Sequence, residues 1–174
     1  ATPTVFAMTN PFTPPTLESI GEGLSVISVP DERWLHCDIK SISLLGNIMA
    51  RQTAVEAGAI EAVLFRDGYL TEGASSNIWL VKDGKLLAPP HDNLILEGIR
   101  YELMEELAKR SGIPFEARRI SQDEVRNADE LLLTAATKEV KPITRLDGQP
   151  VGKGVPGPIF HKLFAAYQEV KAQR

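Results

Sequence analysis

The sequence has one cysteine, few aromatic residues and no long apolar run. A single thiol, Cys37, cannot form a disulfide within the chain, which favours a reducing compartment such as the cytoplasm. No apolar run approaches the roughly 20 residues that a membrane-spanning helix needs. Residues 1–5 have neither a basic stretch nor an apolar core of the signal-peptide type. We therefore expect no contact with a membrane.

Strong positive charge and the common ligand-binding motifs are also missing. The 19 Lys and Arg residues are scattered, and the net charge is -4, so nothing favours a nucleic-acid partner. The three histidines, His36, His91 and His161, share no metal-ligand spacing. Neither a P-loop, a G-x-G-x-x-G fingerprint nor a G-x-S-x-G elbow is present.

The chain is long enough for one full-sized core, and its periodicity predicts an α+β fold with a mixed α/β order of elements and a mixed or largely antiparallel sheet. Apolar residues at helical spacing predict three helices, over residues 44–57, 99–110 and 157–171. In the first, Leu44, Leu45, Ile48, Met49 and Val55 share a face, with Ser43 as N-cap.

Turn chemistry predicts where the strands reverse. Asp67-Gly68, Asp83-Gly84 and Asp147-Gly148 each separate apolar runs, and Asp-Gly tolerates the positive φ of tight hairpins. Ser121 and Glu124 have the spacing of a capping box at the start of a short helix. Shorter apolar runs predict strands over residues 4–9, 24–29, 62–65, 78–81, 85–87, 115–120 and 131–134.

Lys40 is the first candidate for chemistry. A lone lysine is most often a solvated surface residue. Here Ile39 and Ile42 flank it, and we expect them to draw the segment inward, leaving the amine partly desolvated and more nucleophilic. Such an amine can form a Schiff base with an aldehyde.

Glu72 is the second candidate, in a segment of small residues that runs to Asn77. It is either a turn residue or the carboxylate that holds a protonated pyridine nitrogen. Gly73 to Ser76 would let a flat ring approach the backbone. An amine and such a carboxylate are the minimum protein equipment for pyridoxal phosphate chemistry.

Two further segments are candidates for binding a phosphate. Gly98 precedes a predicted helix, whose first N–H groups lack partners within the helix, although the glycine alone is equally well explained as a tight entry turn. The strand ending Thr134-Ala135-Ala136-Thr137 offers further donors, or is an ordinary strand end.

Taken together, these segments resemble the fold-type IV pyridoxal phosphate enzymes, and within that family the D-amino acid aminotransferases. The resemblance covers nearly all of the chain. The motifs that carry it are Cys37-Asp38-Ile39-Lys40-Ser41 with Leu44-Leu45-Gly46-Asn47, Thr71-Glu72-Gly73 with Ser75-Ser76-Asn77, Asp92-Asn93-Leu94-Ile95-Leu96, and the segment from Leu146 to Pro158.

The resemblance implies a fold and a role for each site residue. The fold would be the large domain of a fold-type IV enzyme, a strand-rich mixed sheet or pseudo-barrel with flanking helices. Lys40 would form the Schiff base and shuttle a proton, and Glu72 would bind the pyridine nitrogen. The remaining cofactor-binding residues would pack on the ring or bind the phosphate, and they are Leu96, Ile99, Arg100, Ala135 and Ala136.

The resemblance also implies a division of the chain. Residues 1–10 would be the last strand of an otherwise missing N-terminal domain, 11–17 a Pro-rich linker and 18–174 the large domain. Many relatives have a threonine at Arg100 and a hydroxyl at Ala136. The Arg100 guanidinium either compensates through its charge or points to solvent.

The implied activity is transamination between a D-amino acid, such as D-alanine, and a 2-oxo acid such as 2-oxoglutarate. The alternatives are a branched-chain aminotransferase, a 4-amino-4-deoxychorismate lyase of the same fold, or a catalytically inactive fragment. Relatives are usually homodimers, so we also expect self-association, with Trp34 and Trp79 as interface or core aromatics.

Overall fold

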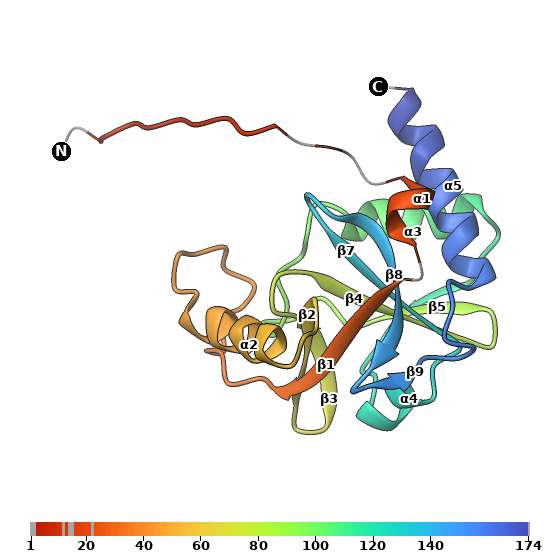
Figure 1. The fold of residues 1–174 in the computed structure, drawn as a ribbon, viewed down its shortest axis with the longest axis horizontal. Helices are drawn as coiled ribbons and strands as arrows, with labels where there is room; N and C mark the ends of the chain where they lie inside the picture. Colours follow the sequence, from red (N-terminus) through yellow and green to blue (C-terminus); the bar gives the residue numbers. More distant parts are fainter. Residues whose placement is uncertain (1–2, 12, 14–15, 22, 174) are drawn as a thin grey trace.

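A single mixed sheet organises the structure, a computed structural model that describes residues 3–11, 13, 16–21 and 23–173. Its main path runs in the order β3-β2-β1-β8-β7-β4-β5-β6, and β9 pairs with β8 (Figure 1). The strands are β1 (Leu24–Pro30), β2 (Glu61–Arg66), β3 (Tyr69–Gly73), β4 (Asn77–Lys82), β5 (Lys85–Ala88), β6 (Phe115–Ala117), β7 (Glu130–Ala135), β8 (Glu139–Leu146) and β9 (Gln149–Pro150). Pairs β1–β2, β1–β8 and β5–β6 are parallel and the others antiparallel. The predicted mixed sheet is thus confirmed.

Five helices accompany the sheet among the described residues. They are α1 (Leu17–Ile20), α2 (Leu45–Glu56), α3 (Tyr101–Arg110), α4 (Gln122–Arg126) and α5 (Pro158–Ala172). The three long helices fall where the periodicity predicts them. The capping box at Ser121 and Glu124 is present, with the Glu124 N–H donating to the Ser121 hydroxyl at 3.2 Å.

Tight turns form at all three predicted Asp-Gly pairs. Asp67, Asp83 and Asp147 have φ between 50° and 52°, and each following glycine also has positive φ. Asp67-Gly68 joins β2 to β3, and Asp83-Gly84 joins β4 to β5. These turns keep consecutive strands adjacent, because a two-residue connection leaves no room for a crossover.

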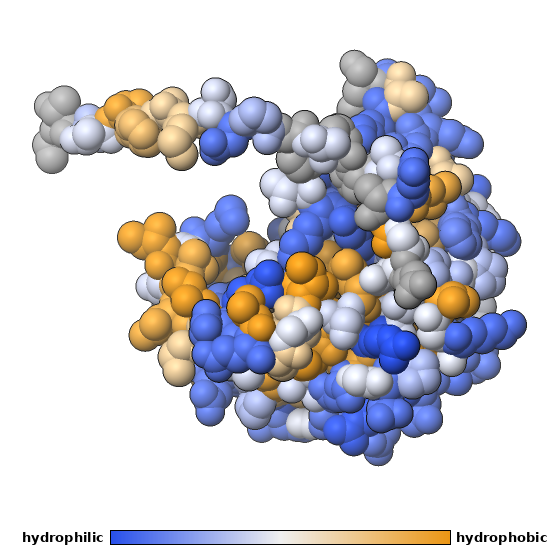
Figure 2. Space-filling model, in the orientation of Figure 1, coloured by the Kyte–Doolittle hydropathy of each residue, from blue (hydrophilic) through white to orange (hydrophobic). Residues whose placement is uncertain are grey.

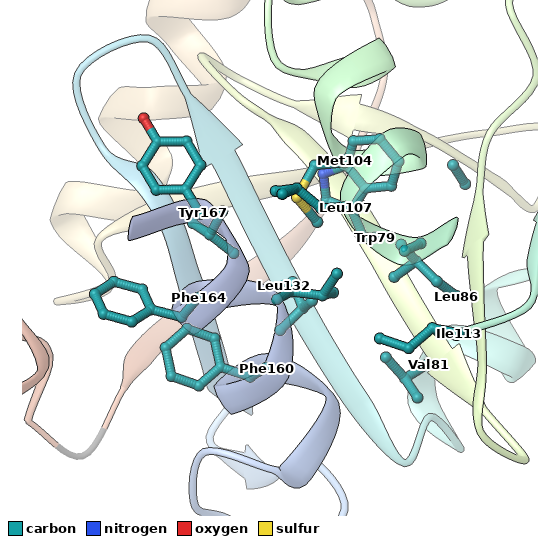
Figure 3. Packing of buried hydrophobic residues seen from close by; sticks show 14 of the residues in the cluster. Trp79, Val81, Leu86, Met104, Leu107, Ile113, Leu132, Phe160, Phe164 and Tyr167 are labelled. Carbon is teal, nitrogen blue, oxygen red and sulfur yellow. The ribbon is translucent and has the colours of Figure 1, made fainter. Parts of the chain in front are cut away.

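Apolar residues cover both faces of the central strands. On one face, α3 and α5 pack against β4, β5 and β7, and Trp79, Met104, Leu107 and Phe160 meet there (Figure 3). The opposite face holds a second cluster that includes Ile78, Leu80 and Val125 of α4. Strands β2, β4 and β7 are therefore buried almost throughout, which explains their unbroken apolar runs.

Helix α2 packs differently from the prediction. Its buried contacts with β1 and β2 are made by small residues, with Ala54 at their centre. The apolar face identified from the sequence is instead exposed, and its residues are Leu44, Leu45, Ile48, Met49 and Val55. Ser43 does not cap the helix either, since the N-cap position is Leu44 and no side chain bonds there.

One other prediction differs from the structure, and the structure decides between the two alternatives for Trp79. Residues 4–9 are exposed and not assigned to a strand, because among the described residues they have no neighbouring strand to pair with (Figure 1). Trp79 belongs to the core, where its indole N–H donates to the Thr134 hydroxyl at 2.9 Å, whereas Trp34 remains exposed. None of the described helices is long and apolar enough to cross a bilayer.

Candidate active site

A cavity of about 620 Å³ lies where the loop before α2, the end of β3, the start of α3 and the end of β7 meet. This volume is within the usual range of small-molecule sites. All seven residues predicted from the sequence line it, namely Lys40, Glu72, Leu96, Ile99, Arg100, Ala135 and Ala136. The fold thus brings together residues that are up to 96 positions apart, from 40 to 136.

Lys40 lies in the loop between β1 and α2. The Cys37 N–H donates to the Asn93 carbonyl at 2.8 Å, and Asn93 Nδ2 donates to the Leu35 carbonyl at 2.6 Å, so this loop is fixed to the segment that leads to Leu96. The expected inward pull of Ile39 and Ile42 is wrong, since Ile42 is 98% exposed. Lys40 is exposed at the cavity mouth and owes its position to the loop rather than to apolar neighbours.

Glu72 is buried on β3, only 6% exposed. Its Oε2 accepts the Leu96 N–H at 3.1 Å and Asn77 Nδ2 at 3.4 Å, and its Oε1 forms an ion pair with Arg33 Nη1. Burial raises the pKa of the Glu72 carboxyl to about 7, although the Arg33 charge and hydrogen bond counteract part of the rise. A turn residue in solvent would have none of these contacts.

Arg33 is the main site residue that the sequence did not reveal. Its Nε and Nη2 bond the two Asp31 oxygens at 2.9 Å, and its Nη2 also donates to the Leu94 carbonyl at 3.1 Å. Burial works against its charge, but Asp31 and Glu72 together raise the pKa of Arg33 above its usual value, so the guanidinium stays charged. No local motif marks Arg33, because Asp31 is its only partner nearby in sequence among those described, whereas Glu72 and Leu94 lie on β3 and in a distant loop.

Small residues between Glu72 and Asn77 form one wall of the cavity. The hydroxyls of Ser75 and Ser76 donate to Glu61 Oε2 at 2.7 and 3.1 Å, and Asn47 of α2 donates to the Ala74 carbonyl at 2.9 Å. These bonds fix the wall without placing a large side chain in it.

Gly98 is required by a close approach rather than by a positive φ. A Cβ at this position would lie 2.3 Å from Asn77 Oδ1. Asn77 in turn donates to the Leu96 carbonyl at 2.9 Å, which fixes the chain before α3. Space at Gly98 therefore lets the N-terminus of α3 come up to the cavity.

The start of α3 and the end of β7 form the other end of the cavity. Ile99 and Arg100 precede the first residue of α3, Tyr101, whose own N–H bonds the Gly98 carbonyl at 2.8 Å. Unpaired N–H groups at a helix start attract anions. Of the two alternatives for Arg100, solvent exposure is wrong, because its Nε and Nη2 donate to the Ala135 and Ala136 carbonyls at 2.8 and 2.7 Å.

Comparisons with known proteins agree with this geometry. The family model Amino-transferase class IV matches residues 1–146. The chain is 44% identical over 167 residues to the D-alanine aminotransferase of Bacillus licheniformis and 38% identical to that of Staphylococcus aureus. Each of these matches covers 96% of this chain and 59% of the relative, so the chain spans about three fifths of the curated relatives.

A solved structure gives the same family assignment. The branched-chain amino acid aminotransferase of Thermobaculum terrenum, solved in its PLP form, superposes with a TM-score of 0.79 at 29% identity. That match covers 90% of this chain and 54% of the other. At this identity and coverage, the fold and the sequence agree: the chain belongs to the class IV amino-transferases.

Proposed function

We propose that this chain is the cofactor-binding part of a pyridoxal phosphate-dependent transaminase that acts on a D-amino acid such as D-alanine and a 2-oxo acid such as 2-oxoglutarate. The observation that carries the proposal is the joint position of Lys40 and the buried Glu72 on one cavity. The identity to D-alanine aminotransferases supports the D-amino acid as substrate.

The residues present fit the cofactor. Pyridoxal phosphate, when bound, supplies an aldehyde for an amine and an electron sink for the substrate α-carbon. Lys40 would hold the cofactor through its amine, and the same amine would carry the substrate α-proton as a general base. Lys40 is exposed and lines the cavity, so its amine is accessible to both the cofactor and the substrate.

Glu72 is the carboxylate for the pyridine nitrogen. Burial disfavours the charge of Glu72 in the cofactor-free protein and raises its pKa, so a protonated ring nitrogen beside it would stabilise the carboxylate. Arg33 and the Leu96 N–H hold the carboxylate in place from behind. Leu96 supplies the apolar contact for the ring, and the α3 start with Ala135 and Ala136 supplies the phosphate site.

Substrate turnover tests the proposal, and the assay uses the complete natural polypeptide with added pyridoxal phosphate. We expect pyruvate from D-alanine only when 2-oxoglutarate is present, with L-alanine as the matched control. Equal turnover of the two alanine isomers would contradict the D-amino acid assignment. No turnover of any amino acid, with the cofactor bound, would favour a catalytically inactive chain.

A branched-chain aminotransferase is the second candidate, because solved enzymes of that name share the fold at TM-scores near 0.8. It predicts turnover of L-leucine with 2-oxoglutarate and none of D-alanine. A lyase acting on 4-amino-4-deoxychorismate would release pyruvate without an amino acceptor. The three reactions are separated by which substrate pair yields product.

A second copy of the chain is the partner we propose for the apolar surface around α2. This surface, which we call the α2 patch, is the exposed set Leu35, Ile39, Ile42, Leu44, Leu45, Ile48 and Met49. It gathers at one end of the molecule beside the cavity (Figure 2). Exposed patches of this kind mark interaction sites. The proposed location is the cytoplasm, in line with the unpaired Cys37.

A further inference from the structure

The Arg100 side chain connects three elements at the phosphate end of the cavity. It occupies the N-cap position of α3 and reaches across to the turn between β7 and β8. There its Nε donates to the Ala135 carbonyl and its Nη2 to the Ala136 carbonyl, while Nη1 bonds the Tyr167 hydroxyl of α5. A threonine is too short to make these contacts.

The bonds leave the guanidinium with donors to spare. Arginine has five N–H donors in a rigid fork, and three are used by these bonds. One hydrogen on each Nη thus has no partner among the described residues. Because Arg100 lines the cavity, a cation with spare donors lies beside the start of α3.

Tyr167 fixes the orientation of this cation. Its ring is buried with Phe160 and Phe164, and its hydroxyl points away from them (Figure 3). The Arg100 guanidinium carbon lies 5.0 Å from the ring centroid, a distance typical of a cation–π contact. The guanidinium therefore contacts both the hydroxyl and the ring of Tyr167.

The other end of the same turn is also anchored. Lys138 Nζ lies 3.0 Å from Glu61 Oε2, and the Glu61 side chain is fully buried. The Lys138 N–H closes the turn on the Ala135 carbonyl at 3.2 Å. The turn is thus held by Arg100 on one side and by Glu61 on the other.

We propose that the Arg100 side chain is a positioning residue that makes this cavity selective for the phosphorylated form of the cofactor. Two effects act together: the guanidinium holds the turn against the start of α3, and its charge favours a dianionic phosphate there. This inference rests on the proposed function, because it assumes that the aldehyde is bound by Lys40.

The ratio of two affinities tests the inference. Pyridoxal phosphate and pyridoxal are each titrated into the complete, cofactor-free protein, and the Lys40 adduct is followed by absorbance. We expect Arg100→Met to lower the preference for the phosphorylated aldehyde by about tenfold, as expected for the loss of a charge-assisted hydrogen bond. Arg100→Lys keeps the charge but loses the forked donor geometry, so its affinity ratio should lie between those of wild type and Arg100→Met.

Two more variants separate positioning from general damage. Tyr167→Phe removes only the hydroxyl and should lower the same ratio by about threefold, the scale of a neutral hydrogen bond. Arg126→Met, at an exposed position on α4, should leave it unchanged. If Arg100→Met does not fold, Arg100→Lys and Tyr167→Phe decide the matter.

A purely structural role for Arg100 would weaken both aldehydes equally and leave the ratio unchanged, which would overturn the inference while the proposed function stands. A wild-type protein that forms a Lys40 adduct with neither aldehyde would overturn both. Hydrogen exchange gives a readout free of the cofactor: inorganic phosphate should slow exchange over residues 135–138 in the wild type and not in Arg100→Met.

Discussion

Glu72 is the residue whose surroundings say most about the site. It is buried beside a charged arginine, yet burial still raises its pKa to about 7 from the usual 4.5. Between these two pH values the folded protein keeps a proton that the unfolded chain has released. The unfolded state therefore binds fewer protons, and this group makes the fold less stable as pH rises through the window.

Glu72→Gln should remove that dependence. In the cofactor-free protein, the difference in unfolding free energy between Glu72→Gln and wild type should shift in favour of the variant from pH 5 to pH 8, by at most about 3 kcal/mol. Urea unfolding at several pH values measures it. Glu32→Gln, at an exposed position in the loop between β1 and α2, is the control and should show no such trend.

With cofactor added, Glu72→Gln should bind pyridoxal phosphate but turn substrate over slowly, because a neutral amide does not hold the ring nitrogen protonated. Wild-type turnover by this variant would argue against the role of Glu72.

Helix α5 owes its start to a buried carboxylate from another element. The N–H groups of Ile159 and Phe160 donate to Glu130 Oε1 and Oε2, both at 2.8 Å. No side chain caps the helix at Gly157, where a Cβ would lie 2.2 Å from the Glu130 carboxyl carbon. Glu130 of β7 thus takes over the capping that a local Ser or Asp usually provides.

Glu130→Ala should therefore destabilise the protein by about 2 kcal/mol, because two N–H groups at the helix start, one buried and one partly buried, lose a charged acceptor. Thermal and urea unfolding measure the loss. Glu169→Ala, on the exposed side of the same helix, should cost little, within about 0.5 kcal/mol. Similar losses for the two variants would mean that the Glu130 carboxylate does not stabilise the start of α5.

Local chemistry made some elements predictable and left others open. The Asp-Gly turns and the Ser121 capping box form wherever their residues stand, since all of their partners are close in sequence. The periodicity of α2 identified an apolar face but not what covers it. The helix buries its alanines against the sheet and exposes its large apolar residues, which no local pattern distinguishes.

The α2 patch is the feature of the whole molecule that points to assembly. Leu45 is 70% exposed within it. If two copies meet there, Leu45→Arg should shift the protein from dimer to monomer in light scattering or sedimentation, because burying an unpaired charge opposes association. Val155→Arg, at an exposed apolar position outside the patch, should remain dimeric. A wild-type monomer at micromolar concentration would contradict the proposed dimer.

The candidate site as a whole was predictable only in part. The seven predicted residues share one cavity. They could be named from the sequence because the resemblance supplied a role for each of them. Three residues were not predicted, namely Arg33, Glu61 and Tyr167. Arg33 contacts Glu72 and Tyr167 contacts Arg100, at least 39 positions away in sequence. Glu61 contacts Ser75 in a loop and the distant Lys138. Long-range polar contacts leave no periodic or spaced signature in the chain.

Trapping of the Lys40 amine is the most direct test of the proposed chemistry. The complete protein is loaded with pyridoxal phosphate, reduced with borohydride and mapped by mass spectrometry, beside Lys40→Ala and the exposed control Lys153→Ala. We predict one phosphopyridoxyl group on Lys40 in wild type and Lys153→Ala, and none at that peptide in Lys40→Ala. Label on other lysines alone, with position 40 unmodified, would contradict the assignment.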